Sequence, residues 1–454
     1  MYPSHGFSKW GLMSINNKAR CLLAAFVCVA LLFEHAFAQV DRWEEHMTAG
    51  RAAAQQGIYA EAEKQFSAAL VEAKNYGPED IRLATTLNSL GLTYQNQGKF
   101  AEAEPLFQRS LAIVKKILGP EHPVVATILN NLALLYETQA KYAEAEPLYQ
   151  RSLAIVEKAL GPEHPDVARG FNNLAALYEA QGKYAEAEPL YQRSLVILEK
   201  ALGSEHPEVA RAFNNLAEIY RAKGDYAKAE PLYQRSLVIA EEAFGPDHPL
   251  VATILNNLAL IYKAHGKIAE AELVYQRSLA IAEKALGPEH PDVAPSLNNL
   301  AAMYRDQGKY SEAESLYQRA LAITEEALGS EHPSVAPVLN GLAVIYREQG
   351  NYGKADAHFK RALIVLEGAL GPNHPNVAFV INDLALLRVA EGRFAEAEPL
   401  FLRALALRES AINPDDRHLA TSLESYATLL RKTARLDEAE RAEARAKAIR
   451  AKFE

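Results

Sequence analysis

The sequence predicts an all-α fold, a solenoid of stacked helical pairs, and three observations lead to that prediction. A His-Pro pair recurs at a constant interval, apolar residues recur at helical spacing inside each unit, and glycine or proline interrupts the helical stretches. A fixed period between 20 and 50 residues is typical of stacked repeat arrays. Residues 80–415 therefore form eight unbroken 42-residue units. The histidines that mark them are His122, His164, His206, His248, His290, His332 and His374, with Asp80 and Asp416 in the same place at the two ends.

Each unit contains two helical stretches joined by a short turn. In residues 122–163, the first stretch has an apolar stripe at positions i, i+3, i+4 and i+7, formed by Leu129, Leu132, Ala133 and Tyr136. The second stretch has an apolar side formed by Tyr142, Ala145, Tyr149, Leu153 and Val156. The turn of sister units holds a glycine suited to a left-handed C-terminal cap, at Gly182, Gly224 and Gly266. Two helices cannot bury these faces alone, so the units must stack on one another.

The unit resembles the tetratricopeptide repeat in three features. These are the Leu-Ala pair Leu132-Ala133, the Gly/Ala-Lys-Tyr-x-x-Ala turn that ends at Ala145, and the second-helix tyrosine Tyr149. The 42-residue length, the Asn-Asn-Leu-Ala core and the Leu-Gly-Pro-Glu-His-Pro connector are similar to the kinesin-light-chain type of that repeat. The resemblance covers roughly residues 45–445 and implies a right-handed superhelix of about ten helical pairs with a concave groove. It departs from the 34-residue form, because Glu157 stands where that form has a proline.

Residues 1–38 do not belong to the array and have the pattern of a signal peptide. Lys9, Lys18 and Arg20 precede the apolar run of residues 21–33, and Ala36-Phe37-Ala38 supplies a small-residue cleavage pattern. Thirteen apolar residues are too few to span a bilayer comfortably. We expect cleavage after Ala38 and export to the periplasm or cell exterior of a bacterium, without membrane insertion. The alternative is an uncleaved anchor.

The two ends of the array depart from the regular unit. Residues 39–79 form a degenerate first unit, and residues 416–454 a degenerate unit that caps the C-terminal end. Terminal repeats are expected to be atypical because one of their faces meets water. The two cysteines, Cys21 and Cys28, both lie in the signal segment, so the mature chain has no disulfide and no cysteine nucleophile.

Charge and motifs exclude several classes of function. The net charge of −9 becomes −11 without residues 1–38, which carry three basic side chains and one acidic one. An acidic chain lacks the basic footprint that non-specific nucleic-acid binding needs. The sequence has no GxxxxGK[ST] phosphate loop, no GxGxxG and no HExxH. We therefore expect no catalytic residues, no cofactor and no enzyme.

The repeated histidines are a metal site only if they converge. Stacked units place equivalent residues roughly 10 Å apart, whereas metal ligands lie about 2 Å from one ion. The interpretation we favour is structural: the His-Pro pair sets the start of each first helix, because a residue before proline is extended. We expect no metal.

Two asparagines follow one another in each first helix. The family resemblance implies that the first of them faces the groove and bonds an extended peptide backbone: Asn88, Asn130, Asn172, Asn214, Asn256, Asn298, Asn340 and Asn382. The alternative is a hydrogen-bond ladder between neighbouring helices. We assign that ladder to the second asparagine, which is Asn131, Asn173, Asn215, Asn257 and Asn299 and becomes Gly341 and Asp383 later.

One further position varies along the array, at the residue after the tyrosine of the first helix. It reads Gln95, Glu137, Glu179, Arg221, Lys263, Arg305, Arg347 and Val389. We call Arg221, Lys263, Arg305 and Arg347 the basic row. Like charges on neighbouring helices repel, so a partner with an acidic segment would explain the row. The alternative is an ordinary solvated face.

The predicted function is that of a non-catalytic scaffold whose groove binds an extended, acidic peptide segment of a partner protein. The alternative is a structural protein of the cell envelope that forms homo-oligomers through the solenoid. The absent motifs disfavour a hydrolase or transferase.

Overall fold

The computed structural model describes residues 42–409 and 417–451, and the signal peptide predicted for residues 1–38 lies outside them. Within those two ranges all regular structure is helical, and no strand occurs. The prediction of an all-α solenoid is confirmed. None of these helices is long and apolar enough to cross a membrane.

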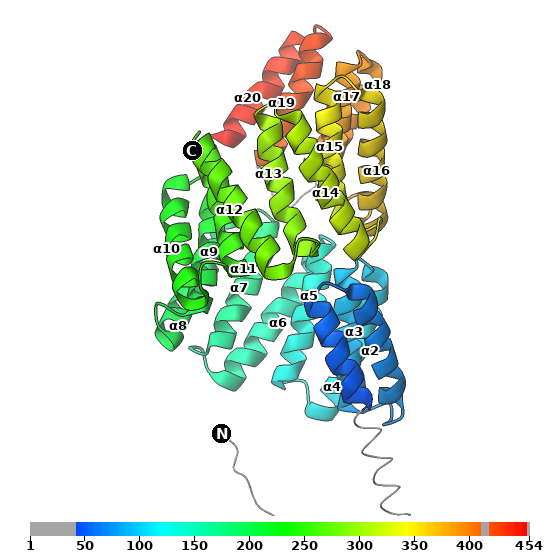
Figure 1. The fold of residues 1–454 in the computed structure, drawn as a ribbon, viewed down its shortest axis with the longest axis vertical. Helices are drawn as coiled ribbons and strands as arrows, with labels where there is room; N and C mark the ends of the chain where they lie inside the picture. The colour runs from blue at the N-terminus through cyan, green and yellow to red at the C-terminus, as the bar shows by residue number, and fades with distance from the viewer. Residues whose placement is uncertain (1–41, 410–416, 452–454) are drawn as a thin grey trace, which may run out of the picture.

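The helices form ten consecutive pairs that stack side by side (Figure 1). The first pair is residues 42–55 with α2 (Tyr59–Lys74). The others are α3 (Ile81–Asn96) with α4 (Phe100–Leu118), α5 (Pro123–Thr138) with α6 (Tyr142–Leu160), α7 (Pro165–Ala180) with α8 (Tyr184–Leu202), α9 (Pro207–Lys223) with α10 (Tyr226–Phe244), α11 (Pro249–Ala264) with α12 (Ile268–Leu286), α13 (Ala294–Asp306) with α14 (Tyr310–Leu328), α15 (Val335–Glu348) with α16 (Tyr352–Leu370), α17 (Pro375–Ala390) with α18 (Phe394–Glu409), and α19 (Arg417–Lys432) with α20 (Leu436–Arg450).

The ends of the helices follow from the local sequence. In all seven His-Pro pairs the histidine Nδ1 accepts the backbone N–H two residues later, as at His206, where Glu208 N lies 3.2 Å away. Five of these histidines are extended N-cap residues of a first helix, which satisfies a donor that the first turn leaves unpaired; His290 caps the 3-10 turn before α13, and the N-cap of α15 is Ser334, two residues after His332. At the other end, Gly182, Gly224 and Gly266 have φ of 70°, 79° and 73°, as predicted. A short 3-10 turn, Pro291–Val293, precedes α13, where Pro295 lacks the N–H of a regular first turn.

The core runs between the two helices of a pair and into the next pair. Ala133, Ala145 and Tyr149 pack with Leu174 and Leu177 of the following unit, and Tyr149 is 3% exposed. A serine of the second helix bonds the first helix, as when Ser152 Oγ donates to the Ala126 carbonyl at 2.9 Å. Each unit therefore buries its apolar stripe only through its neighbours, as a stacked array requires.

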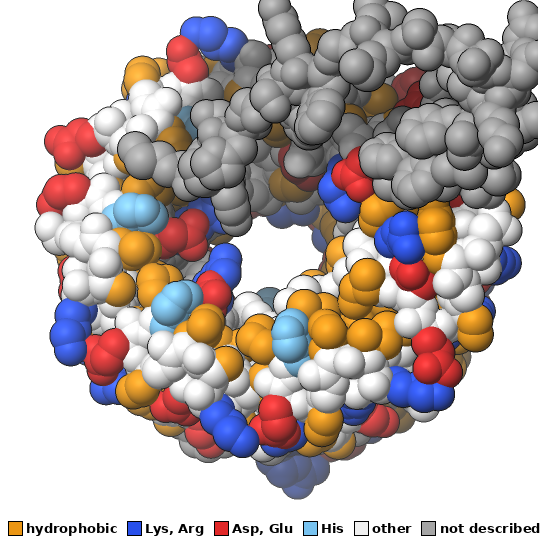
Figure 2. Space-filling model, turned by 90° about the horizontal axis from the view of Figure 1, so that it is seen from below, with side chains coloured by type: hydrophobic (Ala, Val, Ile, Leu, Met, Phe, Trp, Pro, Cys, Tyr) orange, Lys and Arg blue, Asp and Glu red, His pale blue; other side chains and the backbone are white. Residues whose placement is uncertain are grey.

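The stack coils far enough for one turn of the superhelix to touch the next. Pro291 lies against Gly57, His332 and Pro333 lie against Gly98, and His374 bonds the Thr138 carbonyl. The partners in each contact are separated along the chain by about five and a half units. We call this line of contact, between residues 57–142 and residues 290–375, the seam. Viewed along the superhelix, the array is a ring around a central opening (Figure 2).

Candidate functional site

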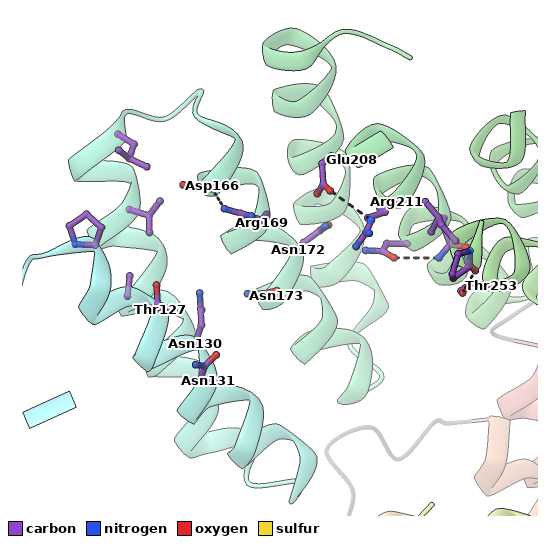
Figure 3. Close-up of a pocket in the computed structure, with 18 of the residues that line it drawn as sticks. Thr127, Asn130, Asn131, Asp166, Arg169, Asn172, Asn173, Glu208, Arg211 and Thr253 are labelled. Carbon is purple, nitrogen blue, oxygen red and sulfur yellow. Dashed lines mark hydrogen bonds and ion pairs between the residues drawn. The ribbon is translucent and has the colours of Figure 1, made fainter. Parts of the chain in front are cut away.

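The first helices of successive units line the inner, concave surface. A hollow of about 880 Å³ extends over α5, α7, α9 and α11, so four consecutive units contribute to it. Asn130, Asn172 and Asn214 of the predicted asparagine row lie in its wall, together with Asn131, Asn173 and Asn215 (Figure 3). The structure therefore brings three of the eight predicted asparagines onto one continuous surface.

Residues one turn before the asparagines also line this hollow, and the sequence analysis missed them. They are Thr127, Arg169, Arg211 and Thr253, which occupy equivalent positions, all exposed. Arg169 pairs with Asp166, and Arg211 lies 3.7 Å from Glu208 on the same helix. Their spacing of i−3 from the first asparagine places them on the same helical face. That spacing is the signal that could have identified them.

The asparagine row also takes part in a ladder between units. Asn131 Nδ2 donates to Asn88 Oδ1 at 2.9 Å, and Asn257 Nδ2 donates to Asn214 Oδ1 at 3.1 Å. At these two steps the second asparagine forms the predicted ladder, with the first asparagine as its acceptor. At the other six units the first asparagine keeps a buried oxygen without a hydrogen-bond partner among the described residues, at Asn130, Asn172, Asn256, Asn298, Asn340 and Asn382.

The last two asparagines of the row differ from the others. Asn340 and Asn382 are only 7% and 6% exposed, whereas the other six are half-buried. Asn340 Nδ2 donates to Asp383 at 2.8 Å, and Asn382 Nδ2 donates to Ser425 at 3.4 Å. Both amides are thus used by the next unit and have little surface to offer a ligand.

Each member of the basic row has a carboxylate partner inside the chain. Arg221 Nε lies 2.9 Å from Glu218 on the same helix. Asp306 is shared, with Lys263 at 2.5 Å and Arg305 at 2.7 Å. Arg347 lies 2.7 Å from Glu348, although its Nη1 is buried without a partner among the residues described. The clustering of like charge that the sequence showed is therefore largely neutralised within the fold.

The two acidic members of the same position have a different environment. Tyr149 donates to Glu137 at 2.8 Å, and Tyr191 donates to Glu179 at 2.9 Å. Burial raises the pKa of Glu137, and it raises the pKa of Glu179 to about 7. Burial acts most strongly to raise the pKa of Glu218, but the bond and charge of Arg221 and the bond from Tyr233 together outweigh it and lower that pKa. The groove wall thus carries protonatable carboxyls near Glu137 and Glu179 and ion pairs from Glu218 onward.

No group of three or more His, Cys, Asp and Glu side chains in residues 42–409 and 417–451 has metal-binding geometry. The repeated histidines accept a backbone N–H in the turn that follows them, and His290, His332 and His374 also meet the other turn at the seam.

The fold and this surface define a helical-repeat protein with one long concave face lined by amides and paired charges. Side-chain amides on such a face offer both hydrogen-bond donors and acceptors. The chain belongs to the tetratricopeptide repeat family, which matches it in overlapping stretches at residues 45–116, 82–158, 124–200, 166–242, 208–284, 274–326, 292–363, 334–410 and 381–452. Proteins with this repeat bind protein partners.

Three solved structures illustrate the similarity. BtubC (BKLC) from P. vanneervenii is 25% identical and covers 52% of this chain and 92% of its own, with a TM-score of 0.40. A Podosopora anserina chain, described as kinesin light chain with nearly identical TPR-like repeats, is 32% identical and covers 45% and 98%, with a TM-score of 0.37. A Rap protein complexed with Competence and Sporulation Factor is 15% identical and covers 92% and 99%, with a TM-score of 0.53. This last likeness supports the fold.

A comparison with curated proteins finds no match.

Proposed function

We propose that the protein is a non-catalytic scaffold whose concave surface binds an extended polypeptide segment of a partner protein. One observation supports this most directly: asparagine amides of three consecutive units, two per unit, line a continuous hollow of about 880 Å³. A side-chain amide offers two donors and an acceptor, which match the N–H and C=O groups of a peptide backbone. Extended backbone has no internal hydrogen bonds, so it needs such partners.

The spacing of the units fits an extended ligand. Neighbouring first helices are about 10 Å apart, and an extended chain rises about 3.3 Å per residue. One asparagine would therefore meet every third peptide residue.

The sequence also favours an acidic partner segment, because of the basic row. Every member of the basic row is paired with a carboxylate of the chain, and the unpaired Nη1 of Arg347 is buried. An acidic ligand would therefore have to displace Glu218, Asp306 or Glu348, so we propose acidity only as a secondary preference for the partner segment.

The experiment that tests this function is affinity capture from a cell-envelope extract of the source organism. It compares the wild type with the triple variant Asn130→Ala, Asn172→Ala, Asn214→Ala, which removes the three first asparagines that line the hollow. The matched control removes three exposed amides of the second helices, Gln150→Ala, Gln192→Ala and Gln234→Ala. We expect a partner that the wild type and the control retain and the asparagine variant loses. Equal recovery of every partner by all three proteins would contradict the proposal.

The second candidate is a structural protein of the envelope that assembles through the solenoid. Light scattering coupled to size exclusion separates the two functions. An oligomer that grows with concentration, together with no asparagine-dependent partner, would favour assembly.

We also propose that the protein is exported, because of the signal-peptide pattern of residues 1–38. Mass spectrometry of the N-terminal peptide tests this. A mature chain that starts at Gln39 is the expected result, and an intact residue 1 in the cytoplasmic fraction is the contrary one.

A further inference from the structure

The seam leaves two rims of the superhelix without a neighbouring coil. In the seam, the turn of one pair receives the connector that precedes the pair six places further along, so that Gly57 receives Pro291 and Gly98 receives Pro333. Because the described chain has ten pairs, the early connectors and the late turns lack such a neighbour. We call the connectors at His122, His164, His206 and His248 the connector rim. We call the turns at Gly266, Gly308, Gly350 and Gly392 the turn rim.

The turn rim has the same backbone as the turns in the seam, but no connector rests on it. Gly98 in the seam and Gly308 on the turn rim have φ of 72° and 75°. A Cβ atom added to Gly98 would lie 2.9 Å from Pro333, whereas one added at any glycine of the turn rim would meet no atom of the described chain within 4 Å. The residue two places later is also uncovered, because Ile268 is 39% exposed and its seam equivalent Phe100 is 6% exposed. The turn rim therefore presents the shape that a connector covers in the seam.

The connector rim exposes the groups that the seam buries. The His164 side chain on the connector rim is 41% exposed, whereas the His290 side chain in the seam is 10% exposed. The apolar residue that ends the second helix before each connector shows the same contrast. Those exposed beside the connector rim are Leu118, Leu160 and Phe244, and those partly buried at the seam are Leu286, Leu328 and Leu370. Figure 2 shows this side of the ring, with histidine side chains at the surface around the opening.

The two rims match each other in register. If a second copy follows the tenth pair as an eleventh, the step of six pairs places each connector of that copy on a turn of the first copy. The contacts formed in this way are His122 on Gly308, His164 on Gly350 and His206 on Gly392. The next connector, at His248, falls on Ala434, whose φ of 59° is left-handed like that of Ala140 in the seam.

We propose that the protein assembles head to tail, with the connector rim of one copy docked on the turn rim of a second copy. This interface continues the seam and uses the same groups. The proline packs on the turn glycine, and the histidine Nε2 donates to the carbonyl two residues before it, as His332 does to Asn96. The leucine that precedes the connector covers the apolar cluster at the turn, as Leu370 does beside Phe100.

Such an interface is heterologous, because it joins two different surfaces of the chain. Each copy that docks leaves one rim of each kind free at the ends of the assembly, so the contact does not close and the superhelix grows into a filament. The inference goes beyond the proposed function and needs no ligand. It identifies the surface through which the chain would meet a second copy of itself.

The test blocks one rim at a time in the full chain. The turn variant carries Gly308→Asn, Gly350→Asn and Gly392→Asn. Asparagine tolerates a left-handed backbone, but its side chain occupies the space that a connector needs.

The opposite rim is blocked at the prolines that follow the histidines. The connector variant carries Pro123→Gln, Pro165→Gln and Pro207→Gln. Glutamine places a longer side chain where the seam leaves only 2.7 Å between Pro291 and a Cβ atom on Gly57. The matched control makes the same substitution at exposed prolines of the second helices in the same three pairs. It carries Pro147→Gln, Pro189→Gln and Pro231→Gln.

Sedimentation velocity measures the mass of each protein between about 1 and about 100 µM, at a salt concentration of about 0.15 M that screens charge repulsion beyond about 8 Å. We expect the wild type and the control to gain mass with concentration, and each rim variant alone to stay monomeric. A mixture of the two rim variants should form a 1:1 dimer and nothing larger, because one intact rim of each kind remains. That dimer also shows that both variants are folded.

Three results would overturn the proposal. The first is a wild type that stays monomeric throughout, which would leave both rims to a different partner. The second is growth of either rim variant alone, since the contact would then join like surfaces or lie elsewhere. The third is a mixture without dimer, from variants whose thermal unfolding equals that of the wild type.

The outcome is separable from that of the proposed function, because no residue of the turn rim lines the hollow. A turn variant that stays monomeric but captures the asparagine-dependent partner would support both assembly through the rims and the scaffold. An assembling wild type without such a partner would leave the filament standing and remove its ligand.

Discussion

Acidification should open the seam at His332, because this histidine is held neutral between two turns. Its Nδ1 accepts the Ser334 N–H at 3.1 Å, so its proton lies on Nε2, which bonds the Asn96 carbonyl. Burial, opposed by that bond, lowers the pKa of His332 to about 4. Protonation of Nδ1 would remove the acceptor of the Ser334 N–H and leave a cation in the contact with Gly98.

The sign and the size of the pH effect on closure of the seam follow from the linkage between proton binding and stability. A pKa that is lower in the closed state than its ordinary value of 6.5 stabilises closure fully above about pH 6.5, and this stabilisation is lost as the pH falls toward 4. The shift of about 2.5 units corresponds to at most about 3 kcal/mol. Between about pH 7.5 and pH 5 the loss is about 2 kcal/mol, or about 30-fold in the closing equilibrium.

The assay is backbone hydrogen exchange of the turn at residues 96–99, corrected for intrinsic rates, in the wild type and in His332→Asn. Asparagine keeps a capping oxygen but does not titrate in this range. We expect exchange of this turn to rise about 30-fold at pH 5 in the wild type and to be insensitive to pH in the variant. His206→Asn, at the same position of a unit outside the seam, should behave as the wild type does.

An internal control lies at residues 138–141. His374 bonds the Thr138 carbonyl, and burial lowers its pKa too, so this turn should keep its response to acid in His332→Asn. The same dependence on pH in the wild type and in His332→Asn at residues 96–99 would refute the reasoning.

Three further predictions concern stability and are measured by thermal unfolding. Glu179→Gln should stabilise the protein at pH 8 by up to about 3 kcal/mol and should have no such effect at pH 4. The reason is that a carboxyl whose pKa is raised to about 7 destabilises the fold increasingly as the pH rises above the ordinary pKa of the group. The exposed Glu186→Gln is the control, and equal effects of the two substitutions at pH 8 would contradict the prediction. Gly341→Ala should destabilise the protein by about 1–3 kcal/mol, because the new Cβ would lie 2.4 Å from the Tyr317 ring. The control Gly368→Ala, whose Cβ would meet no atom within 4 Å, should stabilise the protein by up to about 1 kcal/mol. A stabilising effect of Gly341→Ala would contradict the prediction. Ser236→Ala should lower the free energy of unfolding by no more than about 1 kcal/mol, the value of the hydrogen bond from Ser236 to the Ala210 carbonyl. Later units already have alanine at this position, at Ala320, Ala362 and Ala404. A larger loss would show that the serine hydrogen bond holds the two helices together.

The helices and their turns could be predicted from the sequence because local physics determines them. The stripe through Leu132 and Tyr136 specifies one buried face, and glycine at positions such as Gly182 specifies a left-handed cap. Both features recur at a fixed interval, so the stacking of one unit on the next followed as well.

The seam could not be predicted, because no single residue encodes it. It depends on a small rotation between units that accumulates over about five and a half of them before Gly98 meets His332. The prediction that the histidines set the helix starts was correct, yet it gave no sign that three of them also lie between turns.

Asn130, Asn172 and Asn214 lie in the wall of the hollow, the placement that the family resemblance implies, and their role in binding stays a prediction. The pairing of the basic row was visible in neighbouring residues such as Glu218 and Glu348, which sequence reasoning did not weigh. The burial of Asn382 had a sign too, because Val389 is apolar where earlier units have polar residues.

The seam also changes what it means for this protein to gain or lose a unit. In an open solenoid each repeat touches only its two neighbours, and stability spreads along one dimension. Here the connectors at His290, His332 and His374 also rest on turns of the previous coil, so along the seam each unit has neighbours in two directions. Removal of one whole unit would bring each His-Pro pair opposite the equivalent turn of an adjacent unit, and the seam would stay in register. Removal of half a unit would bring the His-Pro pairs opposite the wrong part of the neighbouring coil and break the contacts of the seam. Such a chain can therefore lengthen or shorten only by whole 42-residue units.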